Sequence, residues 1–138
     1  MSKGPSPNLS WKELACKDGT PYPDEYIEDG TAEVLAFTFE MIRALYNKPI
    51  QVLSAYRTPK WNRLVGGARF SQHMLGRALD LKPPKGTTVK RFYNDLKEHS
   101  GIFYIGGLGL YPTFVHIDIR PSARLICWKG SGVKDTQV

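Results

Sequence analysis

Ser71-Gln-His-Met-Leu-Gly-Arg-Ala-Leu-Asp80 is the stretch around which the rest of the chain is organised. It contains His73, one of three histidines in the 138 residues, and it ends on a carboxylate placed among leucines. Burying a carboxylate in a hydrophobic strand costs free energy unless the carboxylate is paired or bound to a cation. The stretch therefore predicts a strand in which Asp80 has a charged partner or a metal ion.

A second stretch, Phe114-Val-His-Ile-Asp-Ile-Arg120, alternates polar and apolar residues. Alternate residues of a strand share a face, so we expect His116 and Asp118 on one face and the apolar residues on the other. Two imidazoles and one carboxylate that converge make a three-ligand site with an open position, which is the pattern of a catalytic zinc ion. We therefore predict a zinc site made by His73, Asp80 and His116.

Each of these residues also has a structural interpretation. A histidine in an apolar strand is commonly a core residue with satisfied hydrogen bonds, and an aspartate beside leucines commonly caps a strand or forms an ion pair. Spacing alone leaves the structural and the metal-binding interpretations equally open.

Three motifs follow one another along the chain: Ser54-Ala-Tyr-Arg57, Ser71-x-His73-Met-x-Gly76-x-Ala78-x-Asp80-Leu81 and Val115-His116. Together they resemble the zinc D-alanyl-D-alanine carboxypeptidase family of peptidoglycan peptidases, and within it the small single-domain branch. That family includes carboxypeptidases, murein endopeptidases and many phage endolysins, and it shares its metal-site fold with the hedgehog signalling domain. The resemblance covers residues 50–120 and implies a zinc ion that activates water and polarises the scissile carbonyl.

The resemblance also assigns two residues to the substrate. Arg57 corresponds to the arginine that binds the substrate carboxylate or polarises its carbonyl, and a guanidinium suits both tasks. Ser71 corresponds to the family serine at the substrate edge. The structural alternatives are a surface ion pair for Arg57 and a cap of a short turn for Ser71.

The general base is where the sequence departs from the family pattern. Many members place Glu, Asp or His two or three positions before the last zinc histidine, where this chain has Thr113 and Phe114. We predict Asp118 as the catalytic substitute, because it shares a face with the last histidine. Its alternative role is to accept the outer N–H of a zinc histidine and fix the tautomer of that histidine. Tyr111 and His99 are more distant candidates.

Composition describes an ordinary globular protein, with 41% hydrophobic residues, 23% charged residues and a net charge of +6. A basic surface suits nucleic acid, anionic lipid or an anionic polymer such as cell wall, but the basic residues are scattered and no RNA-binding signature is present. We expect bacterial peptidoglycan as the partner, no nucleic-acid or membrane partner, and a monomer. Cys16 and Cys127 either form a disulfide or remain free thiols.

The first residues have no apolar segment of the kind found in signal peptides. We therefore expect synthesis in the cytoplasm, followed by action on the cell wall after release, or transport in a virion.

We predict one zinc peptidase domain over residues 1–138, with an N-terminal arm at 1–30 and a C-terminal tail at 121–138 whose polar end, 130–138, is frayed. Helices are predicted at 31–47, 58–64 and 88–99, the first with an apolar face that includes Val34, Leu35 and Leu45. The predicted fold class is α+β, a small and mostly antiparallel sheet with flanking helices, like that of the hedgehog domain and the D,D-peptidases.

The leading functional hypothesis is a zinc-dependent hydrolase that cleaves peptide bonds in peptidoglycan stem peptides or cross-links, as a D,D-carboxypeptidase or endopeptidase and as a phage endolysin. An iron(II) oxygenase also uses two histidines and one carboxylate, but it usually carries its His-x-Asp pair first, whereas this chain carries it last. A non-catalytic, zinc-stabilised cell-wall-binding module is the remaining alternative.

Overall fold

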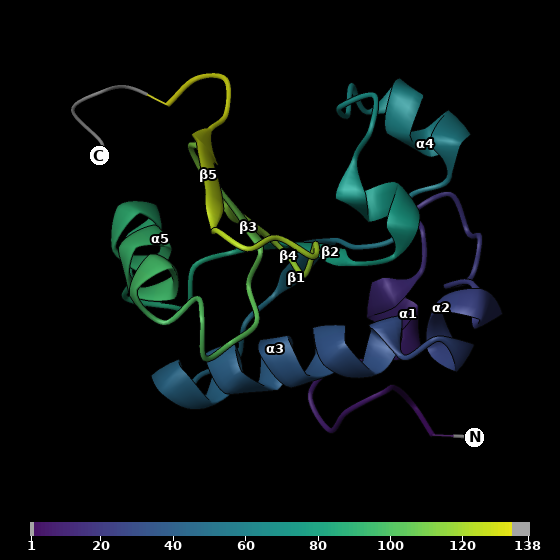
Figure 1. The fold of residues 1–138 in the computed structure, drawn as a ribbon, viewed down its shortest axis with the longest axis horizontal. Helices are drawn as coiled ribbons and strands as arrows, with labels where there is room; N and C mark the ends of the chain where they lie inside the picture. Colours follow the sequence, from purple (N-terminus) through teal and green to yellow (C-terminus); the bar gives the residue numbers. More distant parts are fainter. Residues whose placement is uncertain (1, 134–138) are drawn as a thin grey trace.

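The computed structural model describes residues 2–133 and confirms the predicted α+β class (Figure 1). The elements are α1 (Trp11–Leu14), α2 (Asp24–Glu28), α3 (Thr31–Tyr46), β1 (Val52–Ser54), α4 (Pro59–Leu64), the 3-10 helix η1 (Gln72–Leu75), β2 (Ala78–Leu81), α5 (Val89–Glu98), β3 (Gly107–Leu110), β4 (Val115–Asp118) and β5 (Ile126–Lys129).

The five strands form one sheet in the order β1-β2-β4-β3-β5, in which every pair is antiparallel except β3 with β5. Residues of four strands meet in a single row across this sheet. Asp80 lies opposite His116, His116 lies opposite Gly109, and Gly109 lies opposite Trp128. Because neighbours in a row share a face, the pairing alone places the two predicted ligands of β2 and β4 side by side.

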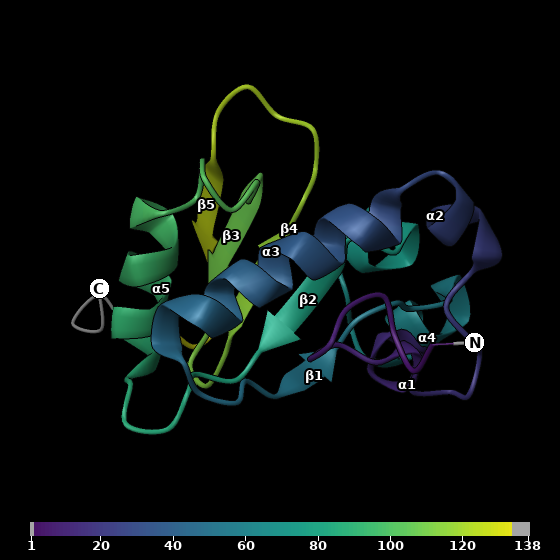
Figure 2. The ribbon, with the colours of Figure 1, turned by 90° about the horizontal axis from the view of Figure 1, so that it is seen from below.

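The opposite face of the sheet is apolar and is covered by helix α3, which crosses it (Figure 2). On this apolar face the row next to the Asp80–His116 row consists of Leu79, Ile117 and Leu108. All three side chains are fully buried. Burial of side chains of this size contributes about 1.5–3 kcal/mol each. The apolar layer therefore fixes the sheet, and with it the register of the polar face.

The predicted apolar face of α3 was partly wrong. Val34 and Leu45 are 41% and 40% exposed, and the buried stripe instead consists of Ala32, Leu35, Ala36, Phe39 and Ile42. Those positions recur at three- and four-residue intervals, as one side of a helix does. Small alanines on this side let the backbone of α3 approach the sheet, while Phe39 fills the core.

The N-terminal segment forms two short helices that pack beside η1. A capping box between Ser10 and Glu13 starts α1, inside the segment predicted as an N-terminal arm. The hydroxyl of Tyr22 donates to the carbonyl oxygen of Gly76 at 2.7 Å. The arm therefore holds the turn that leads from η1 into β2.

The C-terminal segment contains a strand that the sequence did not predict. β5 pairs in parallel with β3 and extends the sheet by one strand. The predicted frayed end lies in part outside the described residues, since the structure describes the chain only to residue 133. Cys16 is buried, Cys127 is exposed, and both are free thiols. None of the helices described between residues 2 and 133 has the length and apolar character needed to cross a membrane.

Gly76 ends η1 with a φ of +68°, and a Cβ placed there would lie 2.5 Å from Cδ2 of Tyr26. Gly76→Ala is therefore expected to lower the free energy of unfolding by about 1–3 kcal/mol, through backbone strain and overlap. Urea denaturation measures this loss. Gly86→Ala is the matched control, because Gly86 has a φ of +87° but its nearest neighbour, Nζ of Lys48, would be 3.6 Å away. Equal losses in the two variants would show that overlap with Tyr26 contributes nothing.

Candidate metal centre

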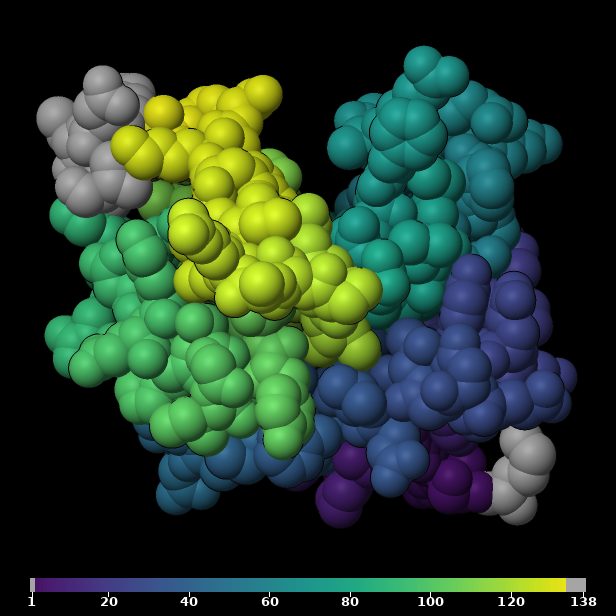
Figure 3. Space-filling model, viewed as in Figure 1, coloured from purple at the N-terminus to yellow at the C-terminus, as the bar shows by residue number. Residues whose placement is uncertain are grey.

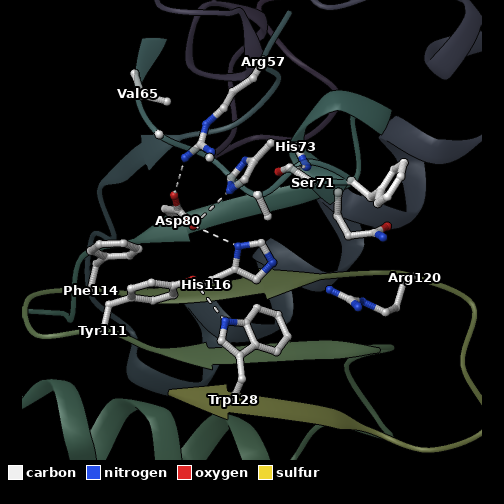
Figure 4. A pocket seen from close by; sticks show the side chains of 15 residues that line it. Arg57, Val65, Ser71, His73, Asp80, Tyr111, Phe114, His116, Arg120 and Trp128 are labelled. Atoms are coloured by element: carbon white, nitrogen blue, oxygen red, sulfur yellow. Dashed lines mark hydrogen bonds and ion pairs between the residues drawn. The ribbon is translucent and has the colours of Figure 1, made fainter. Parts of the chain in front are cut away.

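His73, Asp80 and His116 converge on one point, although they come from η1, β2 and β4 (Figure 4). Nε2 of His73 and Nδ1 of His116 each lie 3.1 Å from Oδ1 of Asp80. The three candidate ligand atoms lie within 4.8 Å of one another, and the residues are 2%, 5% and 6% exposed. The three residues predicted as ligands are thus brought together in a buried cluster.

The outer nitrogen of each imidazole has its own acceptor. Nδ1 of His73 lies 2.6 Å from the carbonyl oxygen of Ala55, and Nε2 of His116 lies 2.8 Å from Oδ2 of Asp118. Both neighbours of each ring are acceptors, so a neutral imidazole donates either outward to these groups or inward to Asp80, and the outward tautomer is the one that a metal ligand needs. The inner nitrogens then present lone pairs to Asp80.

In this tautomer, two imidazole lone pairs and a carboxylate oxygen meet at one place with no proton between them. Such an arrangement is electrostatically unfavourable unless a cation lies among the three atoms. Two neutral imidazole nitrogens and one carboxylate oxygen, with the outer N–H groups held by acceptors, are the donor set of a catalytic zinc site. The residues present thus fit a zinc ion.

Asp80 is ionised in spite of its burial. Burial raises the pKa of Asp80, but the adjacent imidazoles of His116 and His73 outweigh burial and hold this pKa well below its usual range. Its second oxygen, Oδ2, accepts from Nη2 of Arg57 at 3.1 Å. Arg57 is in turn held by Oγ of Ser54 at 3.1 Å and by Oδ1 of Asn62 at 3.2 Å.

Asp118 lies behind His116 and is fully buried. Besides His116, its carboxylate accepts from Nε and Nη2 of Arg120, at 2.8 and 2.7 Å. Burial raises the pKa of Asp118, but the hydrogen bonds from Arg120 and His116 outweigh burial and hold this pKa well below its usual range. These contacts match the alternative role of Asp118, an acceptor that orients His116, more closely than the role of a base facing the substrate.

The cluster of His73, Asp80 and His116 (the metal cluster) lies at the bottom of a cleft of about 490 Å³. The space-filling view shows the hollow between the segment of α4 and η1 and the strand β5 (Figure 3). Arg57 and Ser71, the two residues predicted to contact the substrate, line the wall beside α4 and η1. The Ser71 hydroxyl also accepts from the backbone N–H of His73 at 3.2 Å, so it caps η1 as well.

The second wall contains aromatic residues that the sequence did not assign to a substrate. Tyr111, Phe114 and Trp128 line it together with Arg120. The sequence indicates Tyr111 only as a distant candidate base, and Trp128 lies in the segment 121–138 that was predicted to be a C-terminal tail. The other distant candidate, His99, lies at the end of α5, where a ring nitrogen donates to the carbonyl oxygen of Asp95 at 2.8 Å, and it does not line the cleft.

Comparison with known proteins gives a family for this arrangement. A family model described as peptidase M15 matches residues 7–118, a span that includes all three residues of the metal cluster. No curated protein sequence matches the chain. Because the family model covers more than half of the sequence, the chain belongs to the peptidase M15 family, the metallopeptidases that resemble zinc D-Ala-D-Ala carboxypeptidase.

Proposed function

We propose that the protein is a zinc-dependent hydrolase of bacterial peptidoglycan, one that cleaves peptide bonds in stem peptides or cross-links as a phage endolysin does. The observation that carries the proposal is the convergence of two imidazole nitrogens and one carboxylate oxygen, with an acceptor beside the outer nitrogen of each imidazole. A zinc ion held by His73, Asp80 and His116 would supply an activated water and polarise the scissile carbonyl.

The residues of the chain itself would bind and orient the substrate. Arg57 and Ser71 lie on the wall of the cleft, where a guanidinium and a hydroxyl can bind the carboxylate and amide groups of a peptide. Arg57 also fixes Asp80 from behind the cluster. The catalytic role predicted for Asp118 stays a prediction, and its contacts support a role in orienting His116.

The test is digestion of purified peptidoglycan with and without a chelator, followed by mass spectrometry of the muropeptides. Loss of cross-linked dimers, or of the terminal D-alanine, identifies an endopeptidase or a carboxypeptidase, and the chelator should stop either reaction. The second candidate function is a zinc-stabilised wall-binding module, in which the chain would sediment with peptidoglycan but release no new product. Single-domain organisation, a monomeric state, synthesis in the cytoplasm and later action on the wall remain part of the proposal.

Zinc affinity is expected to fall as the pH is lowered, because protons compete for His116. Burial lowers the pKa of His116, but its hydrogen bonds to Asp118 and Asp80 outweigh burial and raise this pKa above the ordinary value of 6.5. Only the neutral imidazole binds a metal, so affinity is complete above the raised pKa and is lost as the pH falls through it. Burial lowers the pKa of His73, so protons compete less strongly for this ligand than for His116.

Calorimetric titration with zinc from about pH 5 to about pH 8 measures this dependence, which should approach about tenfold per pH unit on the acidic side. An affinity that does not change over this range would contradict the assignment of His116 as a ligand.

A further inference from the structure

The second wall of the cleft contains a hydrogen-bonded pair that the proposed hydrolase mechanism has not yet used. Nε1 of Trp128 lies 3.1 Å from the hydroxyl oxygen of Tyr111. An indole N–H can only donate, so the tyrosine oxygen is the acceptor. The hydroxyl of Tyr111 therefore keeps its own proton available for another acceptor, and its oxygen lies toward His116 in the cleft (Figure 4).

Both rings are held by packing. Tyr111 stacks on Phe114 with ring centroids 4.5 Å apart and planes inclined by 6°. The ring of Trp128 lies 5.1 Å from that of His116, and the guanidinium of Arg120 lies 5.2 Å from the indole. Trp128 therefore holds the hydroxyl of Tyr111 beside His116, a predicted metal ligand that Trp128 itself contacts.

Two glycines make room for this pair. Gly109 lies opposite Trp128 in the β3–β5 register, and a Cβ there would be 2.6 Å from Nε1 of Trp128. A Cβ at Gly130 would overlap the ring of Tyr111. The backbone of β3 and the end of β5 can therefore accommodate the two rings in this position only because side chains are missing at both glycines.

The two arginines that line the cleft each bond a carboxylate. Arg57 is bonded to Asp80, and Arg120 is bonded to Asp118. Asp80 is the only carboxylate among the described residues that line the cleft, and it belongs to the metal cluster. The Tyr111 hydroxyl therefore offers a neutral donor on this wall to an oxygen that develops negative charge.

We propose that Tyr111 is a catalytic residue that donates a hydrogen bond to the oxygen of the scissile carbonyl, and that Trp128 is the positioning residue that orients it. This inference rests on the proposed hydrolase function. In the reaction the water oxygen bonds to the carbonyl carbon, and the carbonyl electron pair moves to oxygen. The pair returns as the C–N bond breaks, and the amine leaves with a proton from the water. Tyr111 keeps its own proton and stabilises the negative oxygen, as preorganised donors do in other hydrolases.

Tyr111→Phe tests the role because it removes the hydroxyl and retains the ring stacked on Phe114. We expect kcat on a muropeptide substrate to fall about 10²–10³-fold, with KM changed by less than about threefold. Affinity for a phosphinate peptide, whose anionic tetrahedral oxygens resemble the transition state, should fall by a similar factor. Zinc content, melting temperature and affinity for the cleaved peptide should stay those of the wild type.

Trp128→Phe tests the positioning role. Alone it should lower kcat by about 10-fold, because the hydroxyl is no longer oriented, but in a Tyr111→Phe background it should have no further effect on kcat. A merely structural role for Trp128 would lower activity equally in both backgrounds. Tyr104→Phe is the matched control, since Tyr104 is 61% exposed and does not line the cleft.

The outcomes separate the two proposals. An active wild type whose Tyr111→Phe variant keeps its kcat and its phosphinate affinity overturns the role of Tyr111 and leaves the hydrolase standing. A wild type loaded with zinc that cleaves no muropeptide overturns the hydrolase, and the role of Tyr111 with it.

Discussion

Replacing His73 with alanine is expected to remove zinc and hydrolytic activity together, with activity falling to background. The variant keeps only two of the three ligand atoms that now lie within 4.8 Å of one another, and a catalytic zinc site needs three protein ligands. It also leaves the Ala55 carbonyl and Asp80 without their imidazole partner. The loss of the donor to the buried Ala55 carbonyl should lower the free energy of unfolding of the apoprotein by about 1–3 kcal/mol.

Metal analysis, muropeptide digestion and urea denaturation measure the three losses. His99→Ala is the matched control, because it makes the same change on α5, outside the cleft. A His73→Ala protein with unchanged zinc content and full lytic activity would remove His73 from the ligand set.

Asp118→Asn is expected to weaken zinc binding by about 10–100-fold, because the amide cannot hold the Nε2 proton of His116 as the carboxylate does. Saturating zinc should then restore much of the hydrolytic rate. The contacts of Asp118 motivate this expectation, since its carboxylate is fully buried and is shared by His116 and Arg120. The partly exposed guanidinium of Arg120 would also lose its counter-ion, and stability should fall by about 1–3 kcal/mol.

The competing role of Asp118 as general base predicts a different result. The same variant would then lose about 10²–10⁴-fold in rate, with zinc affinity intact and no recovery in excess zinc. Calorimetry and rate measurements at several zinc concentrations distinguish the two roles. Asp95→Asn is the control, because Asp95 also bonds an arginine, Arg91, and a tyrosine, Tyr46, but on α5. A variant of Asp118 that loses neither zinc nor rate would exclude both roles.

The convergence of His73, Asp80 and His116 could be predicted because its determinants are local. Two strands with a period of two residues place Asp80 on one face of β2 and His116 on one face of β4, and the glycine turn after His73 connects the first ligand to the second. The resemblance to the family motifs supplied the prediction that these three residues bind zinc. Convergence of the three residues then required only that β2 and β4 be neighbours.

The second wall of the cleft could not be predicted in the same way. Trp128 reaches it only because β5 pairs in parallel with β3, across a connection that includes all of β4, and no local pattern in a short segment specifies such a partner. The error in α3 has a related cause, since Val34 and Phe39 are both apolar and only the position of the sheet decides which is buried. The contacts of Asp118 depend on Arg120, whose hydrogen bonds the alternating pattern does not specify.

The row Asp80–His116–Gly109–Trp128 has a consequence for how the protein is made. Its members come from four strands, and the last of them is near the end of the described chain. During translation, a nascent chain that stops before Trp128 lacks the indole of the second wall and leaves the outer edge of β3 unpaired. Unpaired strand edges favour association between chains, and pairings between distant residues form slowly. A ribosome that stalls before β5 would therefore hold a chain prone to aggregation. Hydrolytic activity is expected only after β5 has been synthesised and has paired with β3.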